Sequence, residues 1–208
     1  MKDNFGLLAT LDRLFAGEPR STLTLDEFLA GLQGRSYAFA IAALNLPNCV
    51  PTGIPWLSTV TGLPMLLLLV QFFSGRTVPS LPSWVGRGGL QRGKLQRFLD
   101  RTRRHIQWLE NTVHARHEGW VNGGPRRLLH AAWLFDIVIL ALPIPFDNFF
   151  PAWAILFICL ALIEDDGVMA ILGWLLTLVT VVWTAFLVML GHAAVMAALA
   201  SLRAVLFS

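Results

Sequence analysis

The feature that most constrains this chain is a run of forty residues, 36–75, without a charged side chain. As one continuous helix the run would be about 60 Å long, enough to cross twice a hydrocarbon core about 30 Å thick. Three prolines between residues 47 and 55 interrupt it, and prolines at that density end a helix. We therefore predict a hairpin with arms at 36–46 and 56–75, which either re-enters the membrane or spans it with unwound backbone at depth.

A second hairpin of the same kind is predicted over residues 128–163. Its arms, 128–142 and 152–163, flank a break that contains Pro143 and Pro145. Both breaks begin with a Leu-Pro pair, and another proline and polar residues follow closely. The two hairpins therefore indicate an internal repeat. Paired broken segments in the two halves of a transporter often mark its substrate site, although both could equally be proline-kinked packing elements.

The C-terminal part predicts a transmembrane helix over residues 168–190, which contain no charge. Residues 193–207 predict a separate, shorter helix. Alanines four residues apart in this helix would allow close approach of another helix in lipid, and we expect a homodimer on that basis. The alternative interpretation is that these alanines occur only because alanine is a good helix former.

Composition agrees with a membrane protein. The chain is 55% hydrophobic and 14% charged, whereas soluble domains carry about 25% charged residues. Eleven basic and three acidic residues lie in 76–127, but one basic and five acidic residues lie in 128–208. A basic block between apolar stretches normally stays in the cytoplasm. Residues 1–20 lack the apolar core of a signal peptide, so internal segments are expected to direct insertion.

We thus predict an all-α, multi-pass integral protein of a bacterial inner membrane, with two broken-helix, re-entrant-like hairpins plus transmembrane and amphipathic helices. Its expected parts are the amphipathic cytoplasmic helices (1–35), the first hairpin (36–75), a basic cytoplasmic loop and helix (76–127), and the second hairpin with the C-terminal membrane helices (128–208).

Two amphipathic segments flank the first hairpin. Residues 7–15 predict a short helix, and Thr24 with Glu27 forms a capping box that begins the next one. Residues 90–118 predict one long helix with apolar residues at three- and four-residue spacing. Its other face is basic and is expected to contact anionic lipid headgroups or a partner protein rather than nucleic acid. That face consists of Arg92, Lys94, Arg97, Arg101, Arg103 and Arg104.

Polar side chains near the two breaks are the candidates for a substrate or ion path. They are Asn45, Asn48, Thr52, Ser58, Thr59, Thr61 and Gln71 in the first hairpin, and Asp147, Asn148 and Glu164 in the second. An acid inside a membrane is expensive to bury and often functional. Asp147 could instead lie at the outer interface and cap the next helix, and the neutral groups could satisfy backbone that the prolines free.

Other polar residues can be interpreted as either functional or structural. Glu164, Asp165 and Asp166 could bind a cation or relay protons, or could form a solvated turn at the membrane edge. Asp136 needs a partner inside its apolar arm, and we expect His130 or an arginine of the basic helix.

No metal, cofactor or catalytic site is predicted. His114, His117 and Glu118 lack a third suitable metal ligand, and Cys49 and Cys159 read as small buried hydrophobes. No nucleotide-binding or nucleophile motif occurs, so an enzyme is not expected.

The combination of motifs resembles the ExoD family of bacterial membrane proteins. It comprises Leu46-Pro47 and Pro51, the segment 58–64 with Gln71, then a basic helix, then Leu142-Pro143-Ile144-Pro145 with Asn148, Pro151, Glu164 and Asp166-Gly167. The resemblance covers about residues 24–190. This chain has Asp147 where members often have glycine. The resemblance implies a link to exopolysaccharide production and alkaline tolerance, and no catalytic residues carry over from it.

Three hypotheses for function follow. The first is a transporter or channel that moves a small ion or solute through the polar groups at the two breaks. The second is a non-catalytic scaffold for polysaccharide export machinery, with the basic helix as its partner or lipid surface. The third is translocation of a lipid or a lipid-linked sugar.

Overall fold

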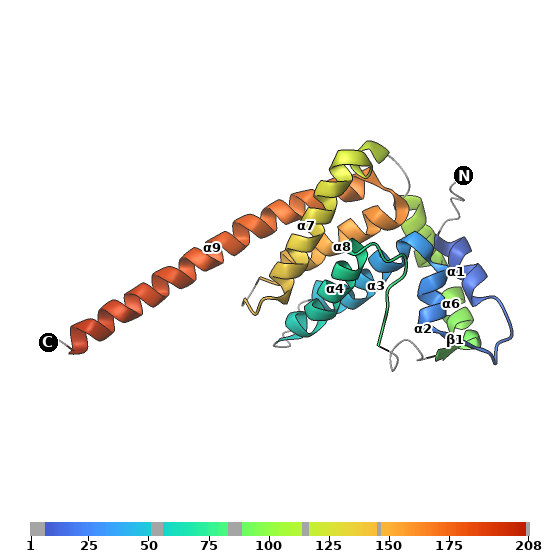
Figure 1. Ribbon diagram of the computed structural model, residues 1–208, viewed down its shortest axis with the longest axis horizontal. Coiled ribbons are helices and arrows are strands. Elements are labelled where there is room, and N and C mark those ends of the chain that lie inside the picture. Colours follow the sequence, from blue (N-terminus) through green and yellow to red (C-terminus); the bar gives the residue numbers. More distant parts are fainter. Residues whose placement is uncertain (1–6, 51–55, 83–88, 114–116, 145–146, 207–208) are drawn as a thin grey trace.

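The protein is all-helical apart from one small two-stranded sheet, as seen in a computed structural model that describes residues 7–50, 56–82, 89–113, 117–144 and 147–206. Figure 1 shows three parts: a bundle formed by both hairpins, a small N-terminal unit beside it, and a long C-terminal helix that projects far beyond the bundle. The longer helices are α1 (Leu7–Phe15), α2 (Leu25–Gly31), α3 (Ser36–Asn45), α4 (Leu57–Phe73), α6 (Arg92–Thr112), α7 (Gly123–Ala141), α8 (Phe149–Glu164) and α9 (Gly167–Leu206).

The first hairpin consists of α3 and α4, and the second consists of α7 and α8. Within the first break, the 3-10 helix η2 (Leu46–Cys49) follows α3 directly. Pro151 lies in the first turn of α8, and Pro64 lies inside α4. The predicted arms match the observed helices, except that α7 begins five residues and α8 three residues earlier than expected. Pro125 occupies the first turn of α7, where its missing N–H would be unpaired in any case.

The two hairpins pack by exchange of arms. The first arm of each lies against the second arm of the other, α3 on α8 and α4 on α7, while the two arms of each hairpin also contact each other. Both crossed pairs are antiparallel: Asn45 at the end of α3 contacts Ala152 at the start of α8, and Gly62 near the start of α4 contacts Ala141 at the end of α7. Both breaks consequently lie at the same end of the bundle.

The bundle core is apolar and closely packed. Its largest fully buried side chain is that of Trp133, which lies among Ile41 of α3, Met65 and Leu69 of α4, and Ile158 of α8. Aromatic rings extend this core toward the end opposite the breaks, where Phe72 contacts Tyr37 and Trp133 edge-on. This closely packed apolar interior fixes the position of the polar groups at the breaks.

The N-terminal unit joins segments far apart in sequence. Strands β1 (Thr22–Thr24) and β2 (Gly89–Gln91) pair antiparallel, with Leu23 opposite Leu90. Helix α1 packs along α6 over a second apolar cluster, separate from the bundle core. The predicted helix over 7–15 and the capping box of Thr24 and Glu27 are confirmed. The pairing of residues 89–91 was not expected from the sequence.

The basic helix is shorter than predicted. Helix α6 covers Arg92–Thr112 rather than 90–118, because residues 89–91 form β2 and a separate 3-10 turn lies at Glu118–Trp120 (η3). Residues 114–116, which the prediction placed in this helix, lie outside the described part of the chain.

The C-terminal prediction of two helices is wrong. Helix α9 runs without a break over 40 residues, through Gly191 and His192. A single glycine costs a helix only about 1 kcal/mol, which its apolar neighbours on both sides offset. The segment Gly167–Ala193 is long and apolar enough to cross a membrane, and only 17% of its most apolar part is buried. Among the described residues, no other helix meets both criteria, since α4 and α8 are shorter apolar helices.

Candidate functional site

The first break is held by two buried asparagines. Asn45, which is fully buried, donates through Nδ2 to the carbonyl oxygen of Ala152 at 2.7 Å. Asn48 donates to Oγ1 of Thr61 at 2.8 Å and so ties η2 to α4. The indole of Trp153 donates to the carbonyl oxygen of Cys49 at 3.2 Å. Two of these bonds end on backbone carbonyls, those of Ala152 and Cys49, and they join the first break to the start of α8.

Other candidates of the first hairpin differ in position. Ser58 is buried on α4, and Oγ1 of Thr59 is buried with no hydrogen bond among the described residues. Thr52 lies outside the described residues. Gln71 lies at the opposite end of α4, where its amide exchanges two hydrogen bonds with the backbone of Ser80 at 3.1 and 2.7 Å. The structure therefore places Gln71 as an anchor of the following loop, apart from the first break.

The second break contains Asp147, which is only 1% exposed. The hydroxyl of Thr184 on α9 lies 3.0 Å from Oδ1 and 2.8 Å from Oδ2 of this carboxyl group. Asn148 occupies the N-cap position of α8 but makes no side-chain capping bond, and its buried Oδ1 has no partner in the described part of the chain. Asp147 thus binds α9 and does not lie at an exposed interface.

Asp136 on α7 is fully buried and also binds α9. Thr177 donates to its Oδ2 at 2.6 Å, and Thr180 faces the same carboxyl group. The expectation that His130 or an arginine of α6 pairs with Asp136 is wrong. His130 instead contacts the ring of Phe72 edge-on, with ring centroids 5.0 Å apart, at the other end of the helix pair.

Threonines 177, 180 and 184 share one face of α9, because residues three, four and seven apart lie on the same side of a helix. This face meets both buried acids of the second hairpin. Sequence reasoning identified Asp147 but missed the threonines. Their three- and four-residue spacing in an otherwise apolar helix is the signal that could have revealed them.

Glu164 and Asp166 lie at the other end of α8 from Asp147. Glu164 is 3.8 Å from Nη1 of Arg35, which joins the end of α8 to the segment before α3. Asp166 is fully buried, and its Oδ1 accepts the N–H groups of Val168 at 2.7 Å and Met169 at 3.4 Å. A carboxylate at this position caps the N-terminus of α9. The structure therefore does not bring Glu164 together with the polar groups of the breaks.

The basic face of α6 is divided. Arg92 donates to the carbonyl oxygens of Leu14 and Ala16, and Arg103 forms a two-bond ion pair with Asp12 at 3.1 and 2.6 Å. These two arginines therefore hold α1. Among the described side chains of α6, the basic ones that remain exposed are those of Lys94, Arg97, Arg101 and Arg104.

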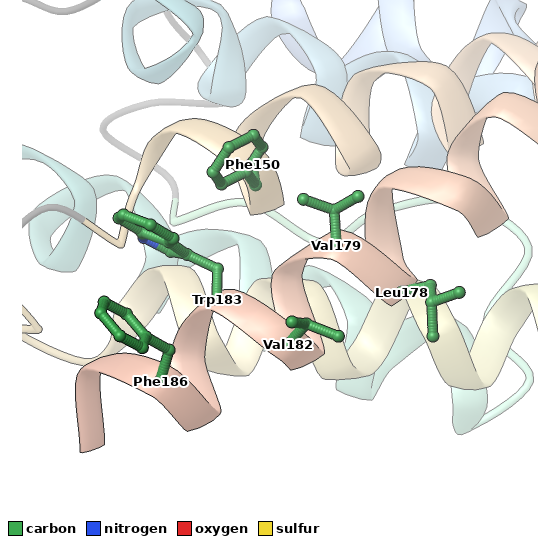
Figure 2. A pocket seen from close by; sticks show the side chains of 6 residues that line it. All are labelled: Phe150, Leu178, Val179, Val182, Trp183 and Phe186. Carbon is green, nitrogen blue, oxygen red and sulfur yellow. The ribbon is translucent and has the colours of Figure 1, made fainter. Parts of the chain in front are cut away.

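An apolar recess of about 510 Å³ lies on the outer side of α8 and α9. Figure 2 shows the rings of Phe150, Trp183 and Phe186 gathered at one end of it. Phe150 and Trp183 meet edge-on with centroids 5.8 Å apart. Its lining contains no polar surface, so the recess does not belong to the polar groups of the breaks. The residues that line it are Phe150, Leu178, Val179, Val182, Trp183 and Phe186.

Comparison with known proteins places these features in a family. The family model described as "Exopolysaccharide synthesis, ExoD" matches residues 7–186, from α1 well into α9. Protein ExoD of Rhizobium meliloti is 28% identical over 189 residues, which cover 89% of this chain and 77% of that protein. An uncharacterized protein of Synechocystis sp. is 27% identical over 158 residues, covering 75% and 74% of the two chains. No solved structure matches. The matched region contains both hairpins, the basic helix and the threonine face of α9, and this chain belongs to the ExoD family of exopolysaccharide synthesis.

Proposed function

We propose that this ExoD-family protein is a multi-pass membrane protein that conducts a small ion or solute, and that exopolysaccharide synthesis and alkaline tolerance depend on this conduction. The observation that carries the proposal is a set of buried polar side chains at one end of an otherwise apolar bundle. Asn45, Asn48 and Asp147 are each less than a tenth exposed there. Polar groups kept inside an apolar membrane bundle are expensive to bury and typically serve a path.

The arrangement of the hairpins supports the proposal. Helix α3 has 10 residues and α8 has 16, so neither is long enough to cross a full hydrocarbon core as a straight helix. We infer that the basic segment 76–127 is cytoplasmic, that both hairpins enter the bilayer from its side, and that their breaks lie at depth. The exchanged packing of arms is what a tandem internal repeat would produce. The breaks are then covered by protein, as unwound backbone in lipid requires.

The proposal is tested by ion flux across proteoliposomes. The purified protein is reconstituted, proton or sodium gradients are imposed, and the lumenal pH or sodium concentration is followed with a dye. Flux above that of empty vesicles is expected, and Asn48→Leu should reduce it because the change removes the bond between η2 and Thr61. Gln107→Leu is the matched control, since Gln107 is exposed on α6. Absence of flux for every gradient would refute conduction.

A scaffold function is the second candidate, and one observation favours it. Four basic side chains remain exposed on α6 after Arg92 and Arg103 have bound α1, so a charged surface is free to contact lipid or an acidic partner. Reversal of charge at Arg97 and Arg101 should then abolish the protein's support of exopolysaccharide production, while Asn48→Leu leaves it intact. The opposite pattern would favour conduction.

A further inference from the structure

Two buried carboxyl groups of the second hairpin, Asp136 and Asp147, meet the same face of α9. Each is hydrogen-bonded to a threonine hydroxyl, Thr177 or Thr184, and each is at most 1% exposed. Oδ1 of Asp136 is buried and has no hydrogen bond among the described residues. These bonds attach α9 to α7 and to the second break.

Among the described residues, no lysine, arginine or histidine forms an ion pair with either acid. Helix α4, which packs on α7, contains no titratable side chain. The other titratable groups on the surrounding elements are Arg126, Arg127 and His130 on α7, Cys159 and Glu164 on α8, Asp165 and Asp166 before α9, His117 and Glu118 at η3, and His192 and Arg203 beyond Thr184 on α9. An ionised carboxylate without a cation is costly in such surroundings, whereas a neutral carboxyl group is tolerated.

The geometry of Thr177 suits both protonation states of Asp136. Its single hydroxyl proton lies within reach of two acceptors, Oδ2 of Asp136 at 2.6 Å and the carbonyl oxygen of Gly173 at 2.9 Å. When the carboxyl group is ionised, the hydroxyl donates to it. When the carboxyl group is protonated, it donates to Oγ1 instead and the hydroxyl turns to Gly173. Rotation of one hydroxyl therefore accommodates gain or loss of the proton.

The oxygen distances show direct contact between these partners. Oxygens 2.6–3.0 Å apart, as in both pairs, are at hydrogen-bond distance, so one proton is shared between each threonine and its carboxyl group. The exchangeable species that this geometry fits is a proton.

We propose that Asp136 and Asp147, with Thr177 and Thr184 of α9, form a proton-binding site and that the proton is the ion conducted. The assignment of the proton as the conducted ion rests on the proposed function, while the binding site does not. On loading, a hydronium ion gives its proton to a carboxylate oxygen, a new O–H bond forms and water leaves. On release, that O–H bond breaks and the proton passes to an incoming water molecule. The attachment of α9 reverses its hydrogen-bond direction at each step.

Infrared spectroscopy of the full chain in lipid vesicles tests the site directly. The carbonyl band of protonated carboxyl groups should be present near neutral pH and should shift in heavy water. Asp136→Asn and Asp147→Asn should each remove one component of this band. Thr177→Val should shift the Asp136 component, while Thr177→Ser should retain it and so guards against a general loss of structure. Asp100→Asn, at an exposed position of α6, should leave the band unchanged.

Proton flux on the same vesicles separates the two proposals. Loss of flux in both Asp variants, with the band components lost, supports both. A band that behaves as expected without any wild-type flux supports the proton site and refutes conduction. Flux that persists in both variants, or a band that neither variant alters, overturns the proton site while conduction by another route stands.

Discussion

Gly62 of α4 lies directly against Ala141 of α7: a methyl group at position 62 would be 2.8 Å from the Cα atom of Ala141 and 2.9 Å from its Cβ atom. Gly62 is buried, and the obstacle is backbone rather than a flexible side chain. Among the glycines of the described residues, Gly62 is the one at which α4 and α7 come into contact. It lets the two breaks lie side by side.

Gly62→Ala is therefore expected to destabilise the bundle by about 1–3 kcal/mol, because overpacking forces backbone apart. Thermal unfolding in detergent micelles measures the effect. Gly191→Ala is the matched control: it lies in α9 with open space around it, and alanine favours the helix. An unchanged midpoint for Gly62→Ala would show that α4 and α7 do not approach this closely.

Asn45 provides a second prediction, because its buried amide is the donor to Ala152. Asn45→Leu should lower the free energy of unfolding by about 1 kcal/mol, the net value of one hydrogen bond. Asn45→Asp should be worse than Asn45→Leu, since a carboxylate cannot donate and would face a carbonyl oxygen. Denaturant titration in micelles gives the order, with Asn111→Leu on the exposed side of α6 as control. Equal effects of the two substitutions would contradict the bond.

The end of α1 depends on side chains of α6. Nε2 of Gln96 donates to the carbonyl oxygens of Phe15 at 2.8 Å and Gly17 at 3.2 Å, and Arg92 binds the neighbouring carbonyls. Phe15 is the last residue of α1, and its carbonyl has no partner within the helix, while Ala16 and Gly17 follow directly after it. Gln96→Ala should therefore speed hydrogen exchange of the last turn of α1, measured by mass spectrometry. Exchange that stays as slow as in the exposed control Gln107→Ala would rule out this capping.

The capping box of α2 predicts a pH dependence. Glu27 accepts the backbone N–H of Thr24 at 3.0 Å, and this bond, followed by that to the Thr24 hydroxyl, holds the pKa of Glu27 below its usual 4.5. A group whose pKa is lowered by folding stabilises the fold above its unfolded pKa, and the stabilisation is lost as pH falls through the folded value. The amides of α2 should thus become less protected in acid below about pH 4.5.

Glu27→Gln provides the comparison for this titration. Glutamine keeps an oxygen that accepts the Thr24 N–H but cannot titrate. Protection of α2 at neutral pH should be similar in the two proteins, once the intrinsic exchange rates are corrected for pH. Only the wild type should lose protection in acid, and parallel profiles would argue against a role for this carboxylate.

Local patterns in the sequence were enough to predict much of the fold. The uncharged run 36–75 and the Leu-Pro pairs located both hairpins, and Thr24 with Glu27 located the start of α2. These features depend on residues close together in the sequence, so a short segment is enough to recognise them. The pairing of residues 22–24 with 89–91 could not be predicted in this way, because it depends on contacts between segments more than sixty residues apart.

The same distinction between local sequence patterns and long-range contacts applies to the candidate site. Asp147 stood out because an acid in an apolar context is conspicuous, but its bond to Thr184 depends on how α9 packs. The expected partner of Asp136 was wrong for that reason, since the residue that binds it follows 41 positions later in the chain. Glu164 and Gln71 were grouped with the breaks from their order in sequence, and the lengths of α8 and α4 carry them to the other end.

The bond between Asn45 and Ala152 spans 107 residues, and this has a consequence for how the protein is made. When the ribosome has completed the first hairpin, the segment that accepts the Asn45 amide does not yet exist. At roughly 5–20 residues per second, Ala152 follows after roughly 4–15 s. Helix α3, about 15 Å long, cannot complete a crossing in that interval by itself. With the membrane placement proposed above, the insertion machinery would have to shelter a half-built hairpin until α8 emerges, and the two hairpins would reach their final depth together.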